Sequence, residues 1–409
     1  MSSTGDRWRS SERGAVLIQT ALLIFVLVGF ATFVLDHGIF WVSRSQAQNS
    51  ADAAAIAGAI ARAYDEFSDP PAAGGATELN AINVSHANMV WKVIPSLAVT
   101  YGCPPEAPAS ARCVRVDVHR DDEFGNPLPV LFGTVLGLTG QGVRATATAR
   151  ALPGNATNCL KPWAIPDRWI ERYPAGAPNG AFDRYAETGP AKGSLLTPSP
   201  DQYDPPTPTD VGSGYQFPTD DLDPRDLGTA LTLEFANPNA ASDPITTGFL
   251  LPLVLPGSKT FDENIAGCNA QLRTFGEQIP TGSPSMKNPT IDGFTALIAD
   301  DPGAFWDAGT RRVTGSCAPA CGAVSPRVVA IALFNADEYQ FRRATDAWGA
   351  CPGGGRCIRI VNILGFFVDS VDGAGRAAGY VTSYPGAMSP GDPTVGSASS
   401  FLKSVALVR

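Results

Sequence analysis

The feature that most constrains this chain is an uninterrupted apolar run near its N-terminus. Residues 15–35 read AVLIQTALLIFVLVGFATFVL and contain no charged side chain. A helix of this length extends about 31 Å, close to the thickness of the hydrocarbon core of a bilayer. A buried core helix is rarely so long without a charge, and a cleaved signal peptide would be followed by small residues instead of Phe40 and Trp41. We therefore expect a transmembrane helix at residues 15–35.

Basic residues flank this run unequally. Arg7, Arg9 and Arg13 precede it, whereas Arg44 alone follows it closely. Because basic residues stay on the cytoplasmic side of a membrane, we expect a cytoplasmic N-terminus at residues 1–14. The expected localisation is the inner membrane, crossed once, with the C-terminal region periplasmic or extracellular. The net charge of −9 and the lack of a basic cluster argue against a nucleic-acid partner.

All eight cysteines lie after the apolar run. An even number of cysteines in an oxidising compartment predicts disulfide bonds. The simplest pairing joins Cys103 to Cys113 and Cys159 to Cys268, and makes two bonds among Cys317, Cys321, Cys351 and Cys357. The alternative is a zinc site formed by the last four cysteines. The five-residue gap between Cys351 and Cys357 is loose for structural zinc, so disulfides are the favoured interpretation.

Residues 36–67 form an alanine-rich extension without proline, and Pro70 and Pro71 follow it. Alanine is the best helix former, so we expect one helix from Arg13 to Phe67 that passes from lipid into water. A stripe of small side chains recurs at alternating four- and three-residue steps: Ala47, Ala51, Ala54, Gly58 and Ala61. A second, more apolar stripe contains Ala53, Ile56, Ile60, Ala63 and Phe67. Two alternatives stay open: the helix docks on another subunit's helix, or it packs on the exported domain of the same chain.

The order of these features resembles the N-terminal region of TadG-like (TadE/TadG) proteins of the Flp/Tad pilus system. The resemblance is carried by Arg13-Gly14, the apolar run, Asp36, Arg44 and the block QNSADAAAIAGA at residues 48–59. It implies a membrane-anchored pilus-assembly or minor pilin-like component that acts through subunit packing. Its implied partners are the inner membrane and other pilus-assembly subunits, contacted through the N-terminal helix.

Two departures from the family pattern bear on processing and on metal binding. Prepilin-like relatives carry a glutamate five residues after the cleaved glycine, whereas here Gly14 is followed by Ala15 and, at the fifth position, Gln19. Processing after Gly14 is therefore a hypothesis. Long TadG-like proteins often carry a D-x-S-x-S metal site, and the sequence contains no such string.

The sequence of the exported region predicts an α+β fold. We expect a small α/β unit at residues 68–157, with helices at 76–88 and 131–138 and strands at 113–119 and 142–151. Residues 158–409 are expected to form a β-rich extracytoplasmic domain, a sandwich or a barrel, with a long loop at 173–227 before its strands. Its expected strands are 231–235, 247–255, 328–334, 357–369, 380–384 and 401–408, with a helix near 295–305.

An acidic group in the long loop raises the question of a metal. The group consists of Asp220, Asp221, Asp223 and Asp226. Calcium sites use several loop carboxylates, but the spacing is not that of an EF-hand, so a solvated acidic loop is the main interpretation and Ca²⁺ the alternative. No other cofactor is expected.

Few residues suggest catalysis. His37, His86 and His119 are the three histidines, and none lies in a recognisable catalytic or metal motif. We therefore expect a protein that is not an enzyme. Two alternatives remain: an unrecognised extracytoplasmic hydrolase, or an anchored binding module that recognises a glycan or a peptide. The binding module would use exposed tryptophans as contacts, namely Trp163, Trp169, Trp306 and Trp348.

Overall fold

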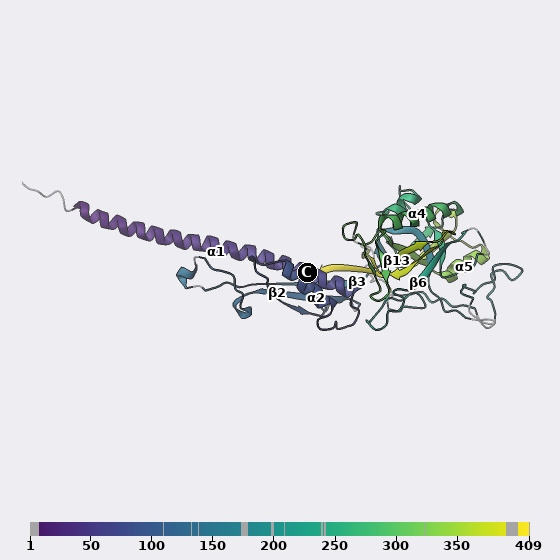
Figure 1. The fold of residues 1–409 in the computed structure, drawn as a ribbon, viewed down its shortest axis with the longest axis horizontal. Coiled ribbons are helices and arrows are strands. Elements are labelled where there is room, and N and C mark those ends of the chain that lie inside the picture. The colour runs from purple at the N-terminus through teal and green to yellow at the C-terminus, as the bar shows by residue number, and fades with distance from the viewer. Residues whose placement is uncertain are drawn as a thin grey trace, which may run out of the picture.

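The computed structural model describes residues 8–108, 110–131, 133–137, 139–172, 179–197, 200–207, 209–238, 240, 243–322, 324–389 and 400–408. The molecule is elongated: a long N-terminal helix leads into a small α/β unit, and a larger β-rich domain lies at the far end (Figure 1). This architecture confirms the mixed α+β class expected from the sequence.

The helices include one that is far longer than the rest. Their bounds are α1 (Trp8–Tyr64), α2 (Ala76–Ala87), α3 (Phe261–Ala266), α4 (Lys287–Asp300) and α5 (Ala336–Thr345). Short 3-10 helices span Asp122–Phe124, Gly133–Leu136, Pro284–Met286 and Pro352–Gly354. The apolar run and the alanine-rich extension are thus one continuous helix, α1, as the absence of proline predicted.

Within the described residues, the strands form two principal sheets and two short two-stranded pairs. Their bounds are β1 (Ser96–Thr100), β2 (Arg112–Arg120), β3 (Val143–Pro153), β4 (Ala156–Thr157), β5 (Leu160–Pro166), β6 (Ala230–Phe235), β7 (Phe249–Pro252), β8 (Arg273–Thr274), β9 (Gln278–Pro280), β10 (Phe305–Asp307), β11 (Arg312–Thr314), β12 (Val328–Phe334), β13 (Cys357–Val371), β14 (Ala377–Thr382), β15 (Tyr384–Pro385) and β16 (Leu402–Val408).

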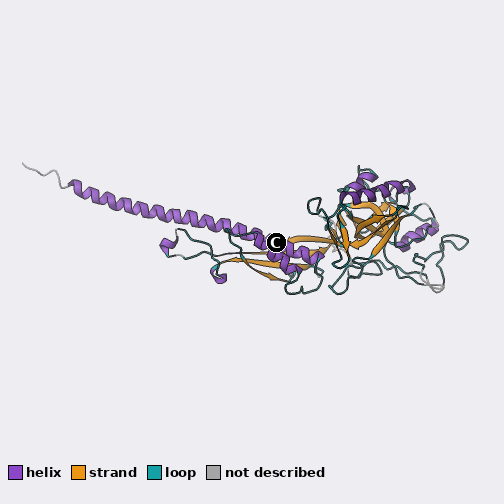
Figure 2. Cartoon of the chain, in the orientation of Figure 1, coloured by secondary structure: helices purple, strands orange, loops and turns teal. Residues whose placement is uncertain are grey.

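The first sheet belongs to the α/β unit and has the order β1-β2-β3-β16-β15. The second half of α1 and the whole of α2 lie along it (Figure 2). Alternate residues of β2, such as Val114, Val116 and Val118, are fully buried, as expected for a sheet with one covered face. The C-terminal strand corrects the domain division. Residues 401–408 were expected in the large domain, but β16 pairs antiparallel with β3.

The second sheet closes into a barrel. Its order is β12-β5-β7-β6-β14-β13-β9, and an additional pairing of β12 with β13 joins the ends of the first six strands. Strand β12 (VVAIALF) is buried along its whole length, because its two faces contribute to two different apolar clusters. Helix α4 packs on one cluster through Phe294, and α5 packs on the other through Tyr339. Of the two architectures expected, the barrel is the one formed.

Two expected helices differ from the structure. The segment 131–138 was expected to be helical, but only the single 3-10 turn Gly133–Leu136 forms there. The helix expected at 295–305 is α4, which begins at Lys287 and ends before Pro302. Pro302 restricts the residue before it, and Pro289 is tolerated because it lies in the first turn of α4.

Candidate functional site

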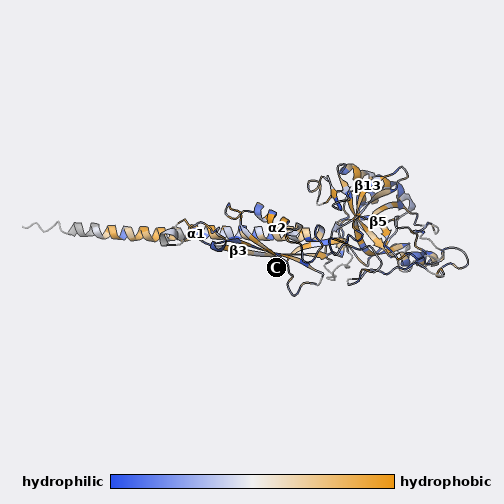
Figure 3. Ribbon diagram, turned by 60° about the horizontal axis from the view of Figure 1, so that its bottom comes forward, coloured by the Kyte–Doolittle hydropathy of each residue, from blue (hydrophilic) through white to orange (hydrophobic). Residues whose placement is uncertain are grey.

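The first half of α1 carries the apolar run on an uncovered helix. Within the described part of the chain, α1 is the one helix long and apolar enough to cross a membrane. Its apolar side chains project away from the rest of the protein: Leu17 is 72% exposed and Phe25 is 67% exposed. Figure 3 shows hydrophobic residues concentrated along this half of the helix. Exposure of so much apolar surface in water is unfavourable, so this half requires lipid or another apolar partner.

Polar and aromatic residues mark the end of the apolar run. Asp36 is only 5% exposed, and its carboxylate accepts hydrogen bonds from the backbone N–H groups of Leu131 and Gly133 at 2.9 and 2.7 Å. On the exposed side, the Trp41 indole donates to His37 Nε2 at 2.6 Å. Trp41 remains 60% exposed, as expected for an aromatic residue at a membrane–water interface. Asp36 therefore fixes part of the α/β unit to α1 at the point where the helix leaves the apolar run.

The small-residue stripe packs on the chain's own α/β unit. All five members are covered: Ala47, Ala51, Ala54, Gly58 and Ala61. Gly58 lies so close to β2 that an added Cβ would approach Val114 Cγ1 to 2.8 Å. Of the two alternatives left open by the sequence, the structure therefore shows intramolecular packing, and a foreign helix has no room on this stripe.

Hydrogen bonds fix the register of this packing. Gln46 Oε1 accepts from the Trp91 backbone N–H at 2.8 Å. The buried hydroxyls of Ser50 and Ser85 lie 3.0 Å apart, which joins α1 to α2. Sequence reasoning singled out neither Gln46 nor Ser50. The sequence signal that could have indicated these contacts is the presence of polar residues on the small-residue face, because a buried polar group needs a hydrogen-bond partner.

The second stripe is only partly covered. Ala63 is 3% exposed and Phe67 packs edge-on against Phe217 of the large domain at 5.1 Å between ring centroids. Ile60, in contrast, is 45% exposed. The end of this stripe, at Ile60 and Phe67, therefore lies at the junction between the two parts of the molecule, whereas Ile56 packs against the core of the α/β unit.

The end of α1 joins the two parts of the molecule. Asp65, which directly follows α1, pairs with Arg312 of the β10–β11 hairpin of the large domain at 3.0 Å. Within the α/β unit, the Tyr64 hydroxyl donates to the Lys403 carbonyl of β16 at 3.2 Å. Burial raises the pKa of Asp65, although Arg312 opposes this shift. Glu66 accepts hydrogen bonds from the N–H groups of Ala72 and Thr77, and so satisfies the start of α2.

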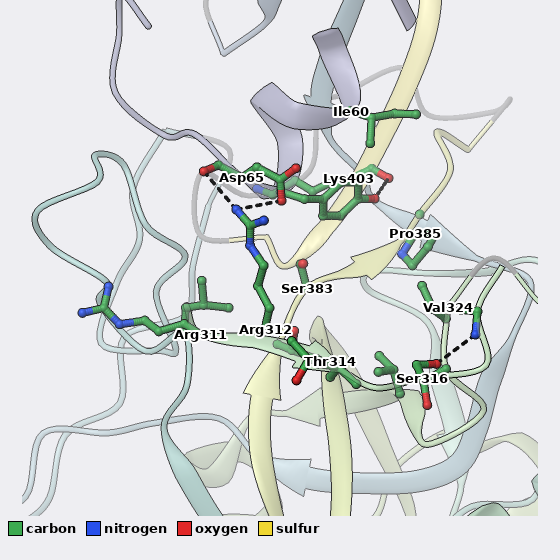
Figure 4. A pocket seen from close by; sticks show the side chains of 18 of the residues that line it. Ile60, Asp65, Arg311, Arg312, Thr314, Ser316, Val324, Ser383, Pro385 and Lys403 are labelled. Carbon is green, nitrogen blue, oxygen red and sulfur yellow. Dashed lines mark hydrogen bonds and ion pairs between the residues drawn. The ribbon is translucent and has the colours of Figure 1, made fainter. Parts of the chain in front are cut away.

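A cavity of about 700 Å³ lies at this junction (Figure 4). Ile60 lines it from α1, Arg311 and Arg312 line it from the hairpin, and Lys403 lines it from β16. Burial lowers the pKa of Lys403 to about 7, and its ammonium group donates to the Ser400 carbonyl at 2.8 Å. The cavity combines apolar and cationic groups with hydroxyl-bearing residues such as Ser316 and Ser383.

The acidic loop does not bring its carboxylates together. Asp220 accepts hydrogen bonds from backbone N–H groups of its own turn, and Asp221 accepts from the N–H groups of Phe67 and Ser68. The remaining two pair with arginines: Asp223 with Arg225 at 2.7 Å, and Asp226 with Arg168. Among the described residues, these four do not form a group whose oxygens lie within metal-ligand distance of one another. Calcium binding by this loop therefore stays a prediction from the sequence.

The cysteines form four disulfides. The pairs are Cys103–Cys113, Cys159–Cys268, Cys317–Cys321 and Cys351–Cys357. A zinc site built from the last four cysteines is therefore wrong, because their thiolates are consumed. Asp301 lies beside Cys317 and Cys321, but those sulfurs are bonded to each other, and the Asp301 carboxylate accepts from the Ser316 and Ser325 hydroxyls.

The tryptophans proposed as ligand contacts pack within the protein. Trp163 is fully buried and stacks on Phe294. The other three are partly buried and engaged: Trp169 against Phe182, Trp306 on Tyr380, and Trp348 against Tyr339. These contacts correct the expectation that the four are exposed.

Two buried charged residues of the large domain are fully engaged in structural contacts. Asp167 has no exposed surface and accepts from the Tyr215 N–H at 2.9 Å and the Tyr203 hydroxyl at 3.0 Å. Burial raises the pKa of Asp167 to about 6, although these hydrogen bonds oppose the shift. Arg327 donates to four backbone carbonyls and lies 4.7 Å from the Phe367 ring centroid.

The histidines do not meet in a catalytic arrangement. His86 lies in the last turn of α2 and is exposed. His119 stacks on Phe124 at 4.4 Å between centroids, with Asp121 Oδ2 3.8 Å from its Nδ1. Gly14, Ala15 and Gln19 lie in the exposed first half of α1, and processing after Gly14 stays a prediction.

Comparison with known proteins finds a family match in the N-terminal region. The chain matches no curated protein and no solved structure. Residues 14–62 match the family model Tad, described as Flp pilus-assembly TadE/G-like. The matched segment contains both the apolar run and the small-residue stripe. The N-terminal region of this chain is thus similar to the TadE/G-like Flp pilus-assembly family, in agreement with the resemblance seen in the sequence.

Proposed function

We propose that this protein is a membrane-anchored assembly component, or a minor pilin-like subunit, of a Tad/Flp-type pilus system. The observation that carries the proposal is the Tad match over residues 14–62, a segment whose first half is an uncovered apolar helix. The protein acts by packing against other pilus-assembly subunits and catalyses no reaction. Residues 1–14 lie in the cytoplasm, and the disulfide-bonded remainder lies outside it.

Two features support this arrangement. Four disulfides on the C-terminal side of the apolar run suit an oxidising compartment. The buried stripe leaves residues 15–35 as the part of α1 available to lipid or to the helices of other subunits. Since the stripe is occupied, subunit contacts through α1 are left to this uncovered half and to exposed positions outside the stripe, such as Trp41 and Ile60.

The proposal is tested by complementation in a native host from which the gene has been deleted. The wild-type chain is expected to restore pili, counted by electron microscopy, whereas Leu27→Arg, with a charge at the middle of the apolar run, is expected to abolish them. Leu222→Arg is the matched control, because Leu222 is 95% exposed on the large domain. Normal pili in the deletion strain, or full activity of Leu27→Arg, would contradict the proposal.

The mature N-terminus distinguishes the two forms of the proposal. A pilin-like subunit processed after Gly14 would begin at Ala15, whereas a fixed assembly factor would retain residues 1–14. Mass spectrometry of the N-terminal peptide from purified membranes makes this distinction directly.

A further inference from the structure

We propose that the tip of the β2–β3 connection is a second membrane contact, which lies in the lipid headgroup region beside α1. We define the tip loop by its described residues, 128–131 and 133–137. The inference rests on the membrane anchoring contained in the proposed function and adds a lipid-binding surface to it. The ligand is the surface of the leaflet from which α1 emerges.

The tip loop is attached to α1 at the membrane boundary. Asp36 is the first residue after the apolar run, and its buried carboxylate accepts the N–H groups of Leu131 and Gly133. A carboxylate held by backbone donors at 2.7–2.9 Å constrains the loop closely, because charge-assisted hydrogen bonds are short and directional. The end of the apolar helix and the tip loop therefore share one level along the helix axis.

The base of the loop is also held. Leu128 and Gln141 exchange backbone hydrogen bonds of 2.8 and 3.3 Å across the base, and Leu128 is 1% exposed. Arg120, at the end of β2, donates to the Pro127 carbonyl at 3.0 Å. The connection projects from the sheet back along α1, toward its N-terminal end (Figure 1). These contacts position the tip loop independently of lipid.

The chemistry of the tip loop suits an interface with lipid. Leu131 is 57% exposed, although the loop around it is well anchored. The sequence from 124 to 143 contains no charged residue, whereas 17% of the whole chain is charged. The charged residues of this connection, Asp121, Asp122 and Glu123, lie at its other 3-10 turn, where Asp121 is the N-cap. An uncharged loop with an exposed leucine next to a membrane helix continues the apolar surface of that helix.

A second exposed apolar position provides an internal comparison. Ile94 is 51% exposed in the α2–β1 connection. That connection is attached to α1 at Gln46, through the Trp91 N–H. Gln46 lies ten residues beyond Asp36, about 15 Å further along the helix, which is more than the thickness of the headgroup layer. Ile94 and Leu131 are thus similarly exposed but are attached to α1 at different heights above the lipid.

The inference is tested on the full chain in vesicles of phosphatidylethanolamine and phosphatidylglycerol. A photoreactive p-benzoylphenylalanine replaces Leu131, Ile94 or Leu27, one position at a time, and adducts are identified by mass spectrometry. We expect lipid adducts at 27 and 131, with about tenfold more at 131 than at 94, since burial of a leucine-sized side chain is favoured by at least that factor. Asp36→Ala, which releases the loop, is expected to reduce the yield at 131 but not at 27.

The outcomes separate this inference from the proposed function. Lipid adducts at 27 with no excess at 131 over 94 would overturn the inference and leave the anchoring intact. Protein adducts in place of lipid adducts at 131 would overturn it too, because they would make the tip loop a subunit contact. No lipid adduct at 27 would refute the anchoring itself, and the inference with it.

Discussion

The close approach of α1 to β2 at Gly58 leads to a prediction about energetic coupling. A Cβ at position 58 would lie 2.8 Å from Val114 Cγ1, which is fully buried, and at ordinary contact distances of 3.4 and 3.5 Å from Thr77 O and Ala81 Cβ. Val114 is therefore the one tight contact. Gly58→Ala should be harmful while Val114 is present and helpful once Val114 is shortened.

The magnitudes follow from two opposing effects. Alanine is favoured over glycine in a helix by about 1 kcal/mol, whereas overpacking a core costs about 1–3 kcal/mol. Gly58→Ala alone should therefore destabilise by about 1 kcal/mol. Val114→Ala removes two buried methyl groups and should cost about 2–3 kcal/mol. In that background, Gly58→Ala should stabilise by about 1 kcal/mol, which gives a favourable coupling of about 2 kcal/mol.

The assay is hydrogen exchange of β2 amides, followed by mass spectrometry on the full chain in nanodiscs. The free energy of opening is compared among the wild type, the two single variants and the double variant. Gly38 serves as the matched control, because nothing lies within 4 Å of its added Cβ. Gly38→Ala should show no coupling to Val114→Ala. Equal destabilisation by Gly58→Ala in both backgrounds would refute the packing of the stripe on β2.

Three further predictions concern the large domain. Asp167 has its pKa raised above the unfolded value of 3.8, so its contribution to stability is fully present below about pH 4 and is lost as pH rises through about 6. The wild type should therefore lose up to about 3 kcal/mol of unfolding free energy between pH 4 and pH 7.5 through this group, and Asp167→Asn should not show that loss. Replacement of both Cys159 and Cys268 by alanine removes a disulfide that closes a loop of sequence separation 109, and should lower the free energy of unfolding in denaturant by about 4–5 kcal/mol. With reducing agent in both samples, this difference from the wild type should disappear. Arg327→Met leaves four carbonyls without their donor and should lower the free energy of unfolding by about 3 kcal/mol or more. A midpoint of thermal unfolding equal to that of the wild type would contradict this prediction.

The parts of the fold that the sequence predicted depend on local patterns. The apolar run and the alanine block specify α1 without any distant contact. Strand β2 was found from its alternation, because one face of its sheet is covered. Strand β12 was found as a continuous apolar run, because both of its faces are buried.

The parts that were missed depend on long-range pairing. Strand β5 contains Pro162 and Pro166, which lack the N–H of a strand donor, yet it pairs with β12 on one side and β7 on the other. The pairing of β16 with β3 joins segments roughly 250 residues apart, and no local pattern indicates which sheet a terminal strand enters.

The sequence predicted which residues of α1 form the candidate site, but it did not predict what those residues contact. The stripe from Ala47 to Ala61 was identified by its spacing, yet spacing alone cannot distinguish a neighbouring helix from the chain's own sheet. Asp36 was noted as part of the family pattern, but its role in holding the β2–β3 connection depends on a loop 95 residues away. The four carboxylates of the acidic loop do not converge, because proximity in sequence does not by itself bring side chains together.

The central claim is that residues 15–35 cross a membrane and deliver the rest of the chain to an oxidising compartment. It is tested most directly in intact spheroplasts, by combining external protease with alkylation of free thiols before lysis. The account predicts that protease removes the C-terminal region, that the α1 fragment stays in the membrane after an alkaline wash, and that none of the eight cysteines is alkylated. A chain that resists external protease, leaves the membrane on washing and carries alkylated cysteines would contradict it.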